Sequence, residues 1–234
     1  MDAGGEIEAV FVDAEADAAA HAPLIDSAAQ RGVRVFELAE GVLAKVADTV
    51  TPQPLLTVLR IPPASLNQLA DTDFVVVCVA VRDPGNLGTV IRSADAAGAQ
   101  AVVCCDGTAD PYNPKTVRAS AGSLLHVPVV TDVPALQTLE ELRRDGLVTV
   151  AAATRGGTPH TVVDWRRRCA VVLGNEAAGL DARLAPAIDE TATIAMAGTA
   201  ESLNVSMAAT VLCFEVLRQR SSLLSVPDTP LTAP

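Results

Sequence analysis

The chain has 234 residues, 50% of them apolar, which is enough for one sizeable domain with a buried core and a small companion. Lysine and arginine number 17 against 28 acidic residues, so the formal net charge is -11 and the long-range field repels polyanions. This charge argues against a nucleic-acid partner without excluding one, because a local basic patch dominates within a Debye length of about 8 Å.

The cysteines all lie in apolar runs without a C-x-x-C pair, which predicts buried, reduced thiols in a cytoplasmic protein. The three histidines are too far apart in sequence for metal-ligand spacing, so no metal is expected. A signal peptide begins with a basic region that is followed by an apolar one. The first residues of this chain are acidic instead, which argues against a signal peptide. No uncharged run approaches the ~20 residues of a membrane-spanning helix, so no membrane association is expected.

Residues 1–61 are predicted to form a small α/β unit of their own. Its expected helices are Ala18–Arg31 and Gly41–Ala47, and its expected strands are Ala9–Val12, Val33–Glu37 and Leu55–Arg60. Pro62 and Pro63 then interrupt regular structure, so residues 62–72 are interpreted as a linker. Residues 221–234 lack periodicity and are expected to form a mobile tail.

Between residues 73 and 220, short runs rich in β-branched residues alternate with helical patterns. The predicted strands are Phe74–Val81, Ala101–Cys105, Val127–Val130, Leu147–Ala153, Cys169–Leu173 and Thr191–Met196. The predicted helices are Leu87–Ala97, Pro114–Ser120, Pro134–Arg144, Leu180–Ile188 and Asn204–Arg220. The strands are continuously apolar rather than alternating, which indicates that both faces are covered. The fold class is therefore α/β, with a mainly parallel sheet between helices.

The helix Leu87–Ala97 has recognisable boundaries. Asn86 is a favourable N-cap, and Gly98 follows the last periodic residue, where a left-handed conformation is commonly required. The helix therefore begins at the carboxyl end of a predicted strand. Open α/β sheets bind ligands at that edge, so the loop RDPGN at residues 82–86 is a candidate site.

Three loops that leave strand ends are rich in glycine and polar residues. They span residues 82–99, 171–180 and 194–215. Glycine lets a backbone approach a ligand closely, yet G-x-G-x-x-G and a P-loop lysine are both absent. Their absence disfavours a phosphate-loop enzyme and a dinucleotide-binding oxidoreductase.

In order and spacing, these loops resemble the three motifs of the SpoU/TrmH family of RNA ribose 2′-O-methyltransferases, in the SPOUT class. The first motif matches at Asn86, Gly88, Arg92, Ala94 and Gly98, and the second at Gly174, Glu176 and Gly179. The third matches at Met196, Gly198, Ser202, Leu203, Asn204, Val205, Ser206 and Glu215. Ala195 departs from the pattern, which has proline there. Residues 9–61 resemble, less closely, the latter part of the family's L30e-like substrate-binding domain, with its first helix missing or shortened.

The resemblance implies a SPOUT methyltransferase domain over residues 73–220, with a C-terminal trefoil knot that binds S-adenosylmethionine. It also implies a homodimer with sites near the subunit interface, and no metal. The expected cofactor-binding residues are Leu173, Gly174, Gly179, Ile194, Met196 and Leu203. In this picture Gly174 permits close approach of the cofactor, while Ile194 and Leu203 supply apolar walls.

The catalytic residues that the resemblance implies are Asn86, Arg92, Glu176, Ser202 and Asn204. Arg92 is assigned to the target 2′-hydroxyl. A guanidinium with a pKa above about 12 is a poor base, which favours stabilisation of the developing alkoxide, with the proton leaving through phosphate or water. From the residues alone, Arg92 could instead pair with Asp95 on its own helix.

Structural roles remain open for the other polar residues. Ser202 or Asn204 could cap the last helix. Asn86 and Glu176 could organise their loops, with Glu176 holding either Arg92 or backbone amides.

For RNA contacts, Lys115 and Arg118 are favoured because they lie in a segment that resembles the family, whereas the run Trp165–Arg168 reads as a solvated turn. The predicted function is S-adenosylmethionine-dependent 2′-O-methylation of RNA. Ribosomal RNA is favoured because the N-terminal unit resembles a ribosomal-protein fold. A tRNA methyltransferase and a non-catalytic RNA-binding or assembly protein remain alternatives.

Overall fold

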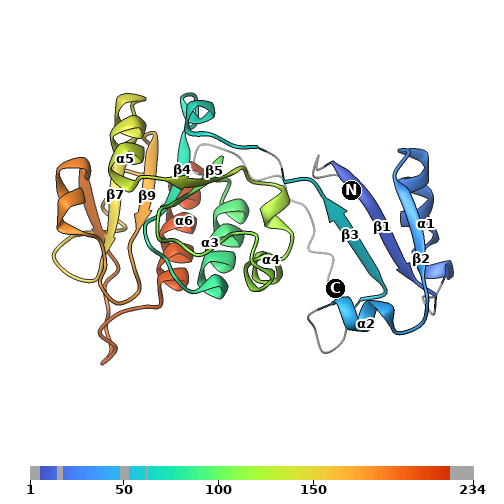
Figure 1. The fold of residues 1–234 in the computed structure, drawn as a ribbon. Coiled ribbons are helices and arrows are strands. Elements are labelled where there is room, and N and C mark those ends of the chain that lie inside the picture. Colours follow the sequence, from blue (N-terminus) through green and yellow to red (C-terminus); the bar gives the residue numbers. More distant parts are fainter. Residues whose placement is uncertain (1–5, 15–17, 48–52, 62, 222–234) are drawn as a thin grey trace. The chain divides into compact units, whose positions relative to one another are not determined.

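The computed structural model describes residues 6–14, 18–47, 53–61 and 63–221 (Figure 1). The chain divides into two compact units, Met1–Pro63 and Ala64–Pro234. Each unit is described by itself below. Of the expected tail, Ser221 is the last residue of a helix, and residues 222–234 lie outside the described residues.

The smaller unit contains the elements that its sequence predicts. In its sheet, β1 (Ile7–Asp13) lies between β2 (Arg34–Leu38), which is parallel to it, and β3 (Leu55–Leu59), which is antiparallel. Its helices are α1 (Ala18–Gln30) and α2 (Val42–Val46). Burial of side chains from the sheet and both helices, among them Val10, Ala28 and Leu43, gives this unit a core of its own.

Most of the expected linker packs on the larger unit. The 3-10 helix η1 (Leu66–Leu69) begins after Ser65, whose backbone N–H donates to Gln68 Oε1 at 2.9 Å. Leu69 is buried among the core residues of the larger unit. The boundary therefore falls after Pro63 rather than after residue 72, because a short helix with one buried leucine follows the prolines.

The larger unit is built on a seven-stranded sheet in the order β6-β5-β4-β9-β7-β10-β8, in which every pairing is parallel. The strands are β4 (Phe74–Cys78), β5 (Ala101–Cys105), β6 (Val129–Val133), β7 (Val148–Ala153), β8 (Thr158–Pro159), β9 (Cys169–Leu173) and β10 (Glu190–Thr193). The helices are α3 (Pro84–Ala96), α4 (Pro114–Ser120), η2 (Ser123–Leu125), α5 (Ala135–Arg144), η3 (Ala182–Ala187) and α6 (Val205–Ser221). Because the strands are parallel, their carboxyl ends share one edge of the sheet.

Several predicted elements differ in the structure, among them the strand predicted to reach Val81, which ends at Cys78. The segment Leu180–Ile188, predicted as an α-helix, contains only the short 3-10 helix η3, and Pro186 inside it cannot donate a backbone hydrogen bond. The strand predicted to reach Met196 ends at Thr193, so residues 194–196 belong to a loop.

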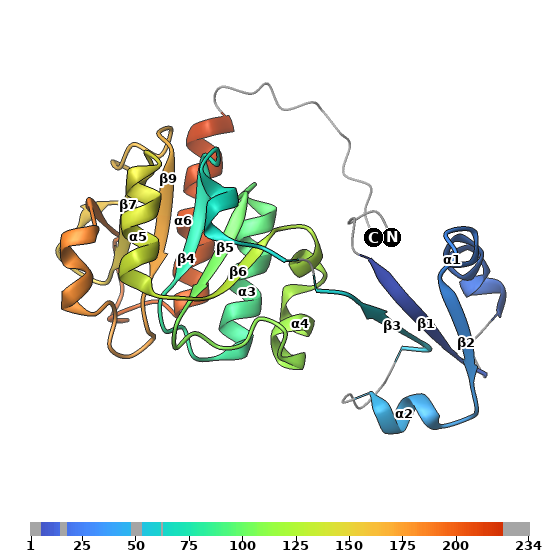
Figure 2. The same cartoon turned by 45° about the horizontal axis from the view of Figure 1, so that its top comes forward.

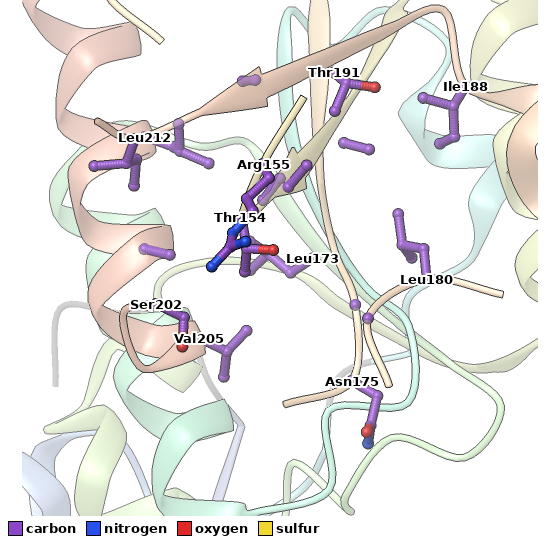
Figure 3. Close-up of a pocket in the computed structure, with 18 of the residues that line it drawn as sticks. Thr154, Arg155, Leu173, Asn175, Leu180, Ile188, Thr191, Ser202, Val205 and Leu212 are labelled. Atoms are coloured by element: carbon purple, nitrogen blue, oxygen red, sulfur yellow. The ribbon is translucent and has the colours of Figure 1, made fainter. Parts of the chain in front are cut away.

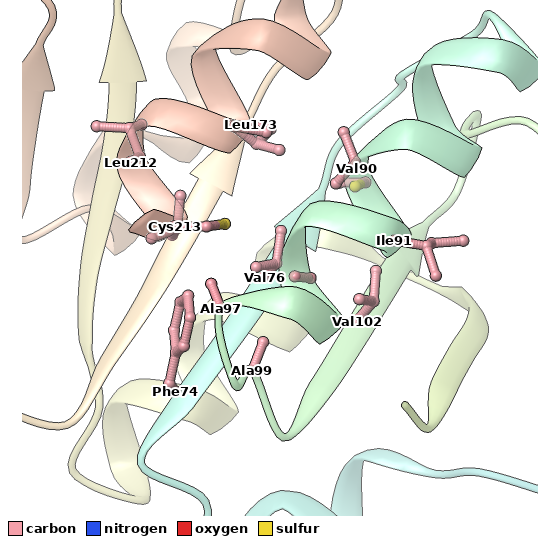
Figure 4. Packing of buried hydrophobic residues seen from close by; sticks show 14 of the residues in the cluster. Phe74, Val76, Val90, Ile91, Ala97, Ala99, Val102, Leu173, Leu212 and Cys213 are labelled. Atoms are coloured by element: carbon pink, nitrogen blue, oxygen red, sulfur yellow. The ribbon is translucent and has the colours of Figure 1, made fainter. Parts of the chain in front are cut away.

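Both faces of the larger sheet are covered, as the continuous apolar strands predict. Val76 packs in the cluster that includes Val90 of α3 and Leu212 of α6, all three fully or almost fully buried (Figure 4). The alternate residues Val75 and Val77 pack in a second cluster with α5 and η3. Figure 2 shows α5 on one side of the sheet and α3 with α6 on the other. Because the sheet is covered on both faces, the strand ends are held in place, and so are the starts of the loops that follow them.

The turn Trp165–Arg168 is solvated at Arg166 and Arg167, as predicted, and it is also hydrogen-bonded within the protein. Trp165 is fully buried and donates from Nε1 to the His160 carbonyl at 2.7 Å. The three arginines of this turn each have partners, which include Asp164, Glu190 and the Asp145 carbonyl. At the end of α6, Arg220 donates to the carbonyls of Trp165 and Arg167. The turn therefore anchors the last helix.

The five cysteines are free and buried, as predicted. Burial raises the pKa of the Cys213 thiol to about 12, so it is an unreactive apolar side chain. Within the described ranges, none of the helices combines the length and apolar character needed to cross a bilayer.

Candidate active site

A cavity of about 590 Å³ lies at the edge where β7, β9 and β10 end (Figure 3). Its lining comes from these three strands, from the segments that follow them and from the first half of α6. All six expected cofactor-binding residues line it, namely Leu173, Gly174, Gly179, Ile194, Met196 and Leu203. Glu176 and Ser202 also line it. The second and third loops singled out in the sequence therefore meet around one cavity.

Gly174 is required by the loop in which it lies. A Cβ atom at this position would be 2.5 Å from the Gly179 carbonyl carbon and 2.7 Å from the Leu180 nitrogen. The loop closes on itself there, because Asn175 and Gly179 exchange both of their backbone hydrogen bonds at 2.9 Å. The close approach that glycine permits is thus one of backbone to backbone, whereas the sequence suggested approach to a cofactor.

A chain of side-chain hydrogen bonds joins the three loops. Asn86 donates from Nδ2 to Glu176 Oε1 at 3.2 Å, and its Oδ1 accepts from Asn204 Nδ2 at 3.0 Å. Asn204 Oδ1 accepts from the backbone N–H of Ser206 at 2.8 Å and from its hydroxyl at 2.7 Å. Asn204 therefore caps α6, as the structural alternative held, and at the same time ties this helix to α3.

Glu176 holds backbone amides rather than Arg92. Its carboxylate accepts from the N–H groups of Arg82 and Asp83, each at 3.2 Å, besides Asn86. Partial burial raises the pKa of the Glu176 carboxyl, but hydrogen bonds from its own backbone amide, from the Asn86 side chain and from these amides outweigh the burial. Its pKa therefore lies below the ordinary value, and the carboxylate is charged at neutral pH.

The start of α3 differs from the sequence-based prediction. The N-cap is Asp83, whose side chain accepts from the Asn86 backbone N–H at 2.9 Å, and Pro84 occupies the first turn. Lys115 pairs with Asp83 at 2.9 Å, and this hydrogen bond is the main cause that lowers the pKa of the Asp83 carboxyl. Because Asp83 supplies the cap, the Asn86 side chain is free to join the other loops. Gly98 ends the helix with a φ of 79°, as expected.

The structure does not bring the expected basic residues into the cavity lining. Arg92, Lys115 and Arg118 are exposed and lie outside it. Asp95, the alternative partner of Arg92, pairs instead with His126 at 3.2 Å. Arg92 forms no hydrogen bond or ion pair within the described part of the chain. Its guanidinium is therefore available to a group from outside.

Comparison with protein families shows which family has this sequence and fold. The model of the SpoU rRNA methylase family matches residues 73–214, which include the first two loops, all but the last residue of the third, and the cavity lining. The chain belongs to this family. The family predicted from the three motifs is thus confirmed.

Similar proteins in the SpoU family have been named and solved. The 23S rRNA (guanosine(2553)-2'-O)-methyltransferase RlmP of Bacillus subtilis is 39% identical over 193 residues, 82% of this chain and 76% of that protein. An AdoMet-bound rRNA methyltransferase from Sinorhizobium meliloti has a TM-score of 0.82 at 30% identity, covering 96% of this chain and 83% of that one. The SpoU methyltransferase AviRb from Streptomyces viridochromogenes, in complex with AdoMet, has a TM-score of 0.80 at 31% identity, covering 94% and 86%. These likenesses confirm the α/β fold with its mainly parallel sheet.

Sequence reasoning missed part of the cavity of this SpoU protein. Thr154 and Arg155, which follow β7, line the cavity, as do Leu180, Ile188 and Leu212. The strand Leu147–Ala153 was predicted, and its carboxyl end lies on the same edge, so that position was the signal for the first two residues. In the described part of the chain, no group of three or more His, Cys, Asp or Glu side chains could hold a metal ion.

Replacement of Glu176 tests the contact between the SpoU loops. We expect Glu176→Gln to lower the melting temperature by about 2–4 °C, because its amide group presents a donor to the donors that the carboxylate now accepts. The folded-state pKa is lowered, so this stabilisation is fully present above the unfolded value of about 4.3 and is lost as the pH falls through the folded value. Thermal unfolding from about pH 3 to pH 8 should show a difference that is constant above about pH 5 and shrinks below about pH 4. Glu140→Gln, at an exposed position of α5, is the control and should differ little at any pH.

Proposed function

We propose that this chain is an S-adenosylmethionine-dependent enzyme that methylates the 2′-hydroxyl of a ribose in ribosomal RNA. One observation carries the proposal: the second and third loops, far apart in the sequence, meet around a single cavity at one edge of the sheet, and hydrogen bonds among Asn86, Glu176 and Asn204 tie them to the first loop. Relatives named as 23S rRNA 2'-O-methyltransferases support ribosomal RNA over tRNA as the substrate.

The cavity fits the proposed cofactor. Its volume of about 590 Å³ is in the range of small-molecule sites, about 300–1,000 Å³. Leu180, Ile188, Ile194 and Leu203 provide apolar surface for an adenosine group. Two of the similar structures carry AdoMet, which supports the same ligand here. When bound, the cofactor supplies an electrophilic methyl group on a sulfonium centre.

The protein's own task is to position the acceptor and to compensate charge. Transfer of a methyl group needs in-line approach, which rigid loops favour. Ser202 lines the cavity and forms no hydrogen bond within the described residues, so its hydroxyl is available to the incoming ribose. Arg92 is proposed to stabilise the oxygen as its proton leaves through phosphate or water. The hydrogen-bonded chain Glu176–Asn86–Asn204 holds the three loops together.

A homodimer is part of the proposal. Met207 and Phe214, which are 60% and 44% exposed, lie seven residues apart and therefore on the same face of α6. Arg92 lies on α3, which packs beside α6, and it is outside the lining of its own chain's cavity. A second copy that covered this apolar face would bury both side chains and bring its Arg92 toward the cavity. Light scattering should then give a mass near twice 24.1 kDa.

Further parts of the proposal concern the chain path and the RNA. We propose that the segment after β9 forms the trefoil knot of SPOUT proteins. In the sheet, β9 lies between β4 and β7, two strands that precede it in the chain. The smaller unit is proposed to recognise RNA shape, and the exposed Lys115 and Arg118 to contact phosphates. A ribosomal RNA substrate would place the protein in the cytoplasm.

Methylation of RNA in vitro tests the proposal. Purified protein would be incubated with labelled S-adenosylmethionine and, separately, with 23S rRNA and tRNA from a strain that lacks this protein. We expect label in 23S rRNA at one ribose, with the same position unmethylated in the deletion strain. Label only in tRNA would favour the tRNA alternative. Retained cofactor without transfer to either RNA would favour a non-catalytic RNA-binding protein.

The apolar wall of the cavity provides a second test. We expect Leu203→Asp to weaken S-adenosylmethionine binding at least tenfold, because an ionised carboxylate would lose hydration against the adenosine group. Isothermal titration calorimetry measures the affinity. Leu136→Asp, at a 43%-exposed position of α5 outside the cavity, is the matched control and should bind normally. Unchanged affinity in Leu203→Asp would contradict the assigned wall.

A further inference from the structure

The ionisable side chains of the cavity are mostly acidic. Arg155 is the one basic residue in the lining, and it stands among five carboxylates, those of Glu176, Asp181, Asp189, Glu190 and Glu201. An excess of carboxylates suits a cationic ligand, but the number of charges matters less than which of them lack a partner.

Four of the carboxylates are already engaged. Asp181, Asp189 and Glu190 each pair with an arginine outside the lining, at 2.5, 2.9 and 2.7 Å, and these partners are Arg183, Arg143 and Arg167. Glu176 accepts from backbone amides and from Asn86. Each of these groups is therefore compensated by the protein itself.

Arg155 and Glu201 are the charged lining residues that remain. Both are exposed, and neither forms a hydrogen bond or an ion pair within the described ranges, with each other or with any other residue. The two side chains carry opposite charges and do not pair with each other. They therefore offer a hydrogen-bond donor and an acceptor to a ligand that has both a negative and a positive group.

Arg155 and Glu201 line the same cavity. In Figure 3, Leu180 and Ile188 lie on one side, whereas Arg155, Thr154 and Ser202 lie on the other. The Arg155 side chain extends into the space between the end of β7 and the start of α6. Glu201 directly precedes Ser202 in the chain and lines the same cavity. The side of the cavity that holds Arg155 and Ser202 also carries the apolar side chains of Val205 and Leu212 (Figure 3).

We propose that Arg155 and Glu201 form the subsite for the amino-acid end of the cofactor, an inference that rests on the proposed function. The Arg155 guanidinium receives the α-carboxylate in a charge-assisted hydrogen bond, and the Glu201 carboxylate receives the α-ammonium group. The adenosine group then lies against the apolar lining residues, among them Leu180 and Ile188. A mixed pair fits a zwitterion better than an RNA phosphate, because Glu201 would repel the phosphate that Arg155 attracts.

Ligands that lack one charge at a time test the proposal by calorimetry. S-adenosylhomocysteine carries both groups, its decarboxylated analogue carries only the ammonium, and methylthioadenosine carries neither. We expect Arg155→Ala to weaken S-adenosylhomocysteine roughly tenfold and to leave the decarboxylated analogue unchanged. Glu201→Gln should weaken both ligands that carry the ammonium. Methylthioadenosine should bind both variants as it binds the wild type, which shows that the cavity is folded.

The outcomes separate this proposal from the function on which it rests. Equal losses in Arg155→Ala for the two charged ligands, or no loss for either, would overturn the subsite. Loss of RNA methylation with unchanged S-adenosylhomocysteine affinity would also overturn it, by assigning Arg155 to the RNA. If the wild type binds none of the three nucleosides, the cofactor itself is wrong. Arg144→Ala, at an exposed arginine outside the cavity, is the matched control and should bind all ligands normally.

Discussion

Arg92→Ala is expected to reduce methyl transfer at least ~100-fold while leaving S-adenosylmethionine affinity nearly unchanged. The magnitude is that typically observed when one group that stabilises a developing oxyanion is removed. Arg92 lies outside the cavity lining and has no partner within the described residues, so its removal should disturb neither the proposed cofactor site nor the fold. An effect confined to kcat would therefore mark a group that acts on the acceptor oxygen.

Single-turnover transfer to 23S rRNA and calorimetric cofactor binding should be measured on the same preparation. Arg144→Ala, on the same unit and equally exposed, controls for the loss of one positive charge and should retain activity. Wild-type turnover in Arg92→Ala would remove Arg92 from the mechanism. A parallel loss of cofactor affinity would assign it a role in binding instead.

Gly174→Ala is expected to weaken cofactor binding at least tenfold and to destabilise the larger unit by about 1–3 kcal/mol. The new Cβ atom would meet backbone atoms of Gly179 and Leu180 at 2.5–2.7 Å, and backbone cannot turn aside as a flexible side chain can. The pair of hydrogen bonds between Asn175 and Gly179 would open. Because Gly174, Asn175 and Gly179 all line the cavity, its shape would change with the loop.

Gly198→Ala is the matched control for this substitution. It lies in the third motif, but a Cβ atom there would have no heavy atom within 4 Å, and it is outside the cavity lining. Calorimetry and thermal unfolding should find Gly198→Ala close to the wild type. Normal binding and stability in Gly174→Ala would show that the loop can relax, and glycine would then not be needed for its closure.

Local patterns predicted much of the fold and the cavity. Apolar runs predicted every strand of the larger sheet except the two-residue β8, and in β4, β5 and β9 burial on both faces demands apolar side chains at every position. The resemblance to the family's motifs implied six cofactor-binding residues, and all six line one cavity. Helix ends were less certain: Asn86 is a good cap by type, yet Asp83 takes this role with Pro84 behind it.

The sequence by itself thus determined the fold class, which depends on periodicity within short segments. It also determined the family and the cavity residues of the second and third loops, which depend on short motifs. Only the tertiary structure decided that Asn86 joins Glu176 to Asn204, that Arg92 stays outside the cavity, and that the charges of Arg155 and Glu201 remain unpaired in its lining. The physical reason is the strand order. β9 pairs between β4 and β7, and this long-range pairing, which no local pattern encodes, sets the loops side by side.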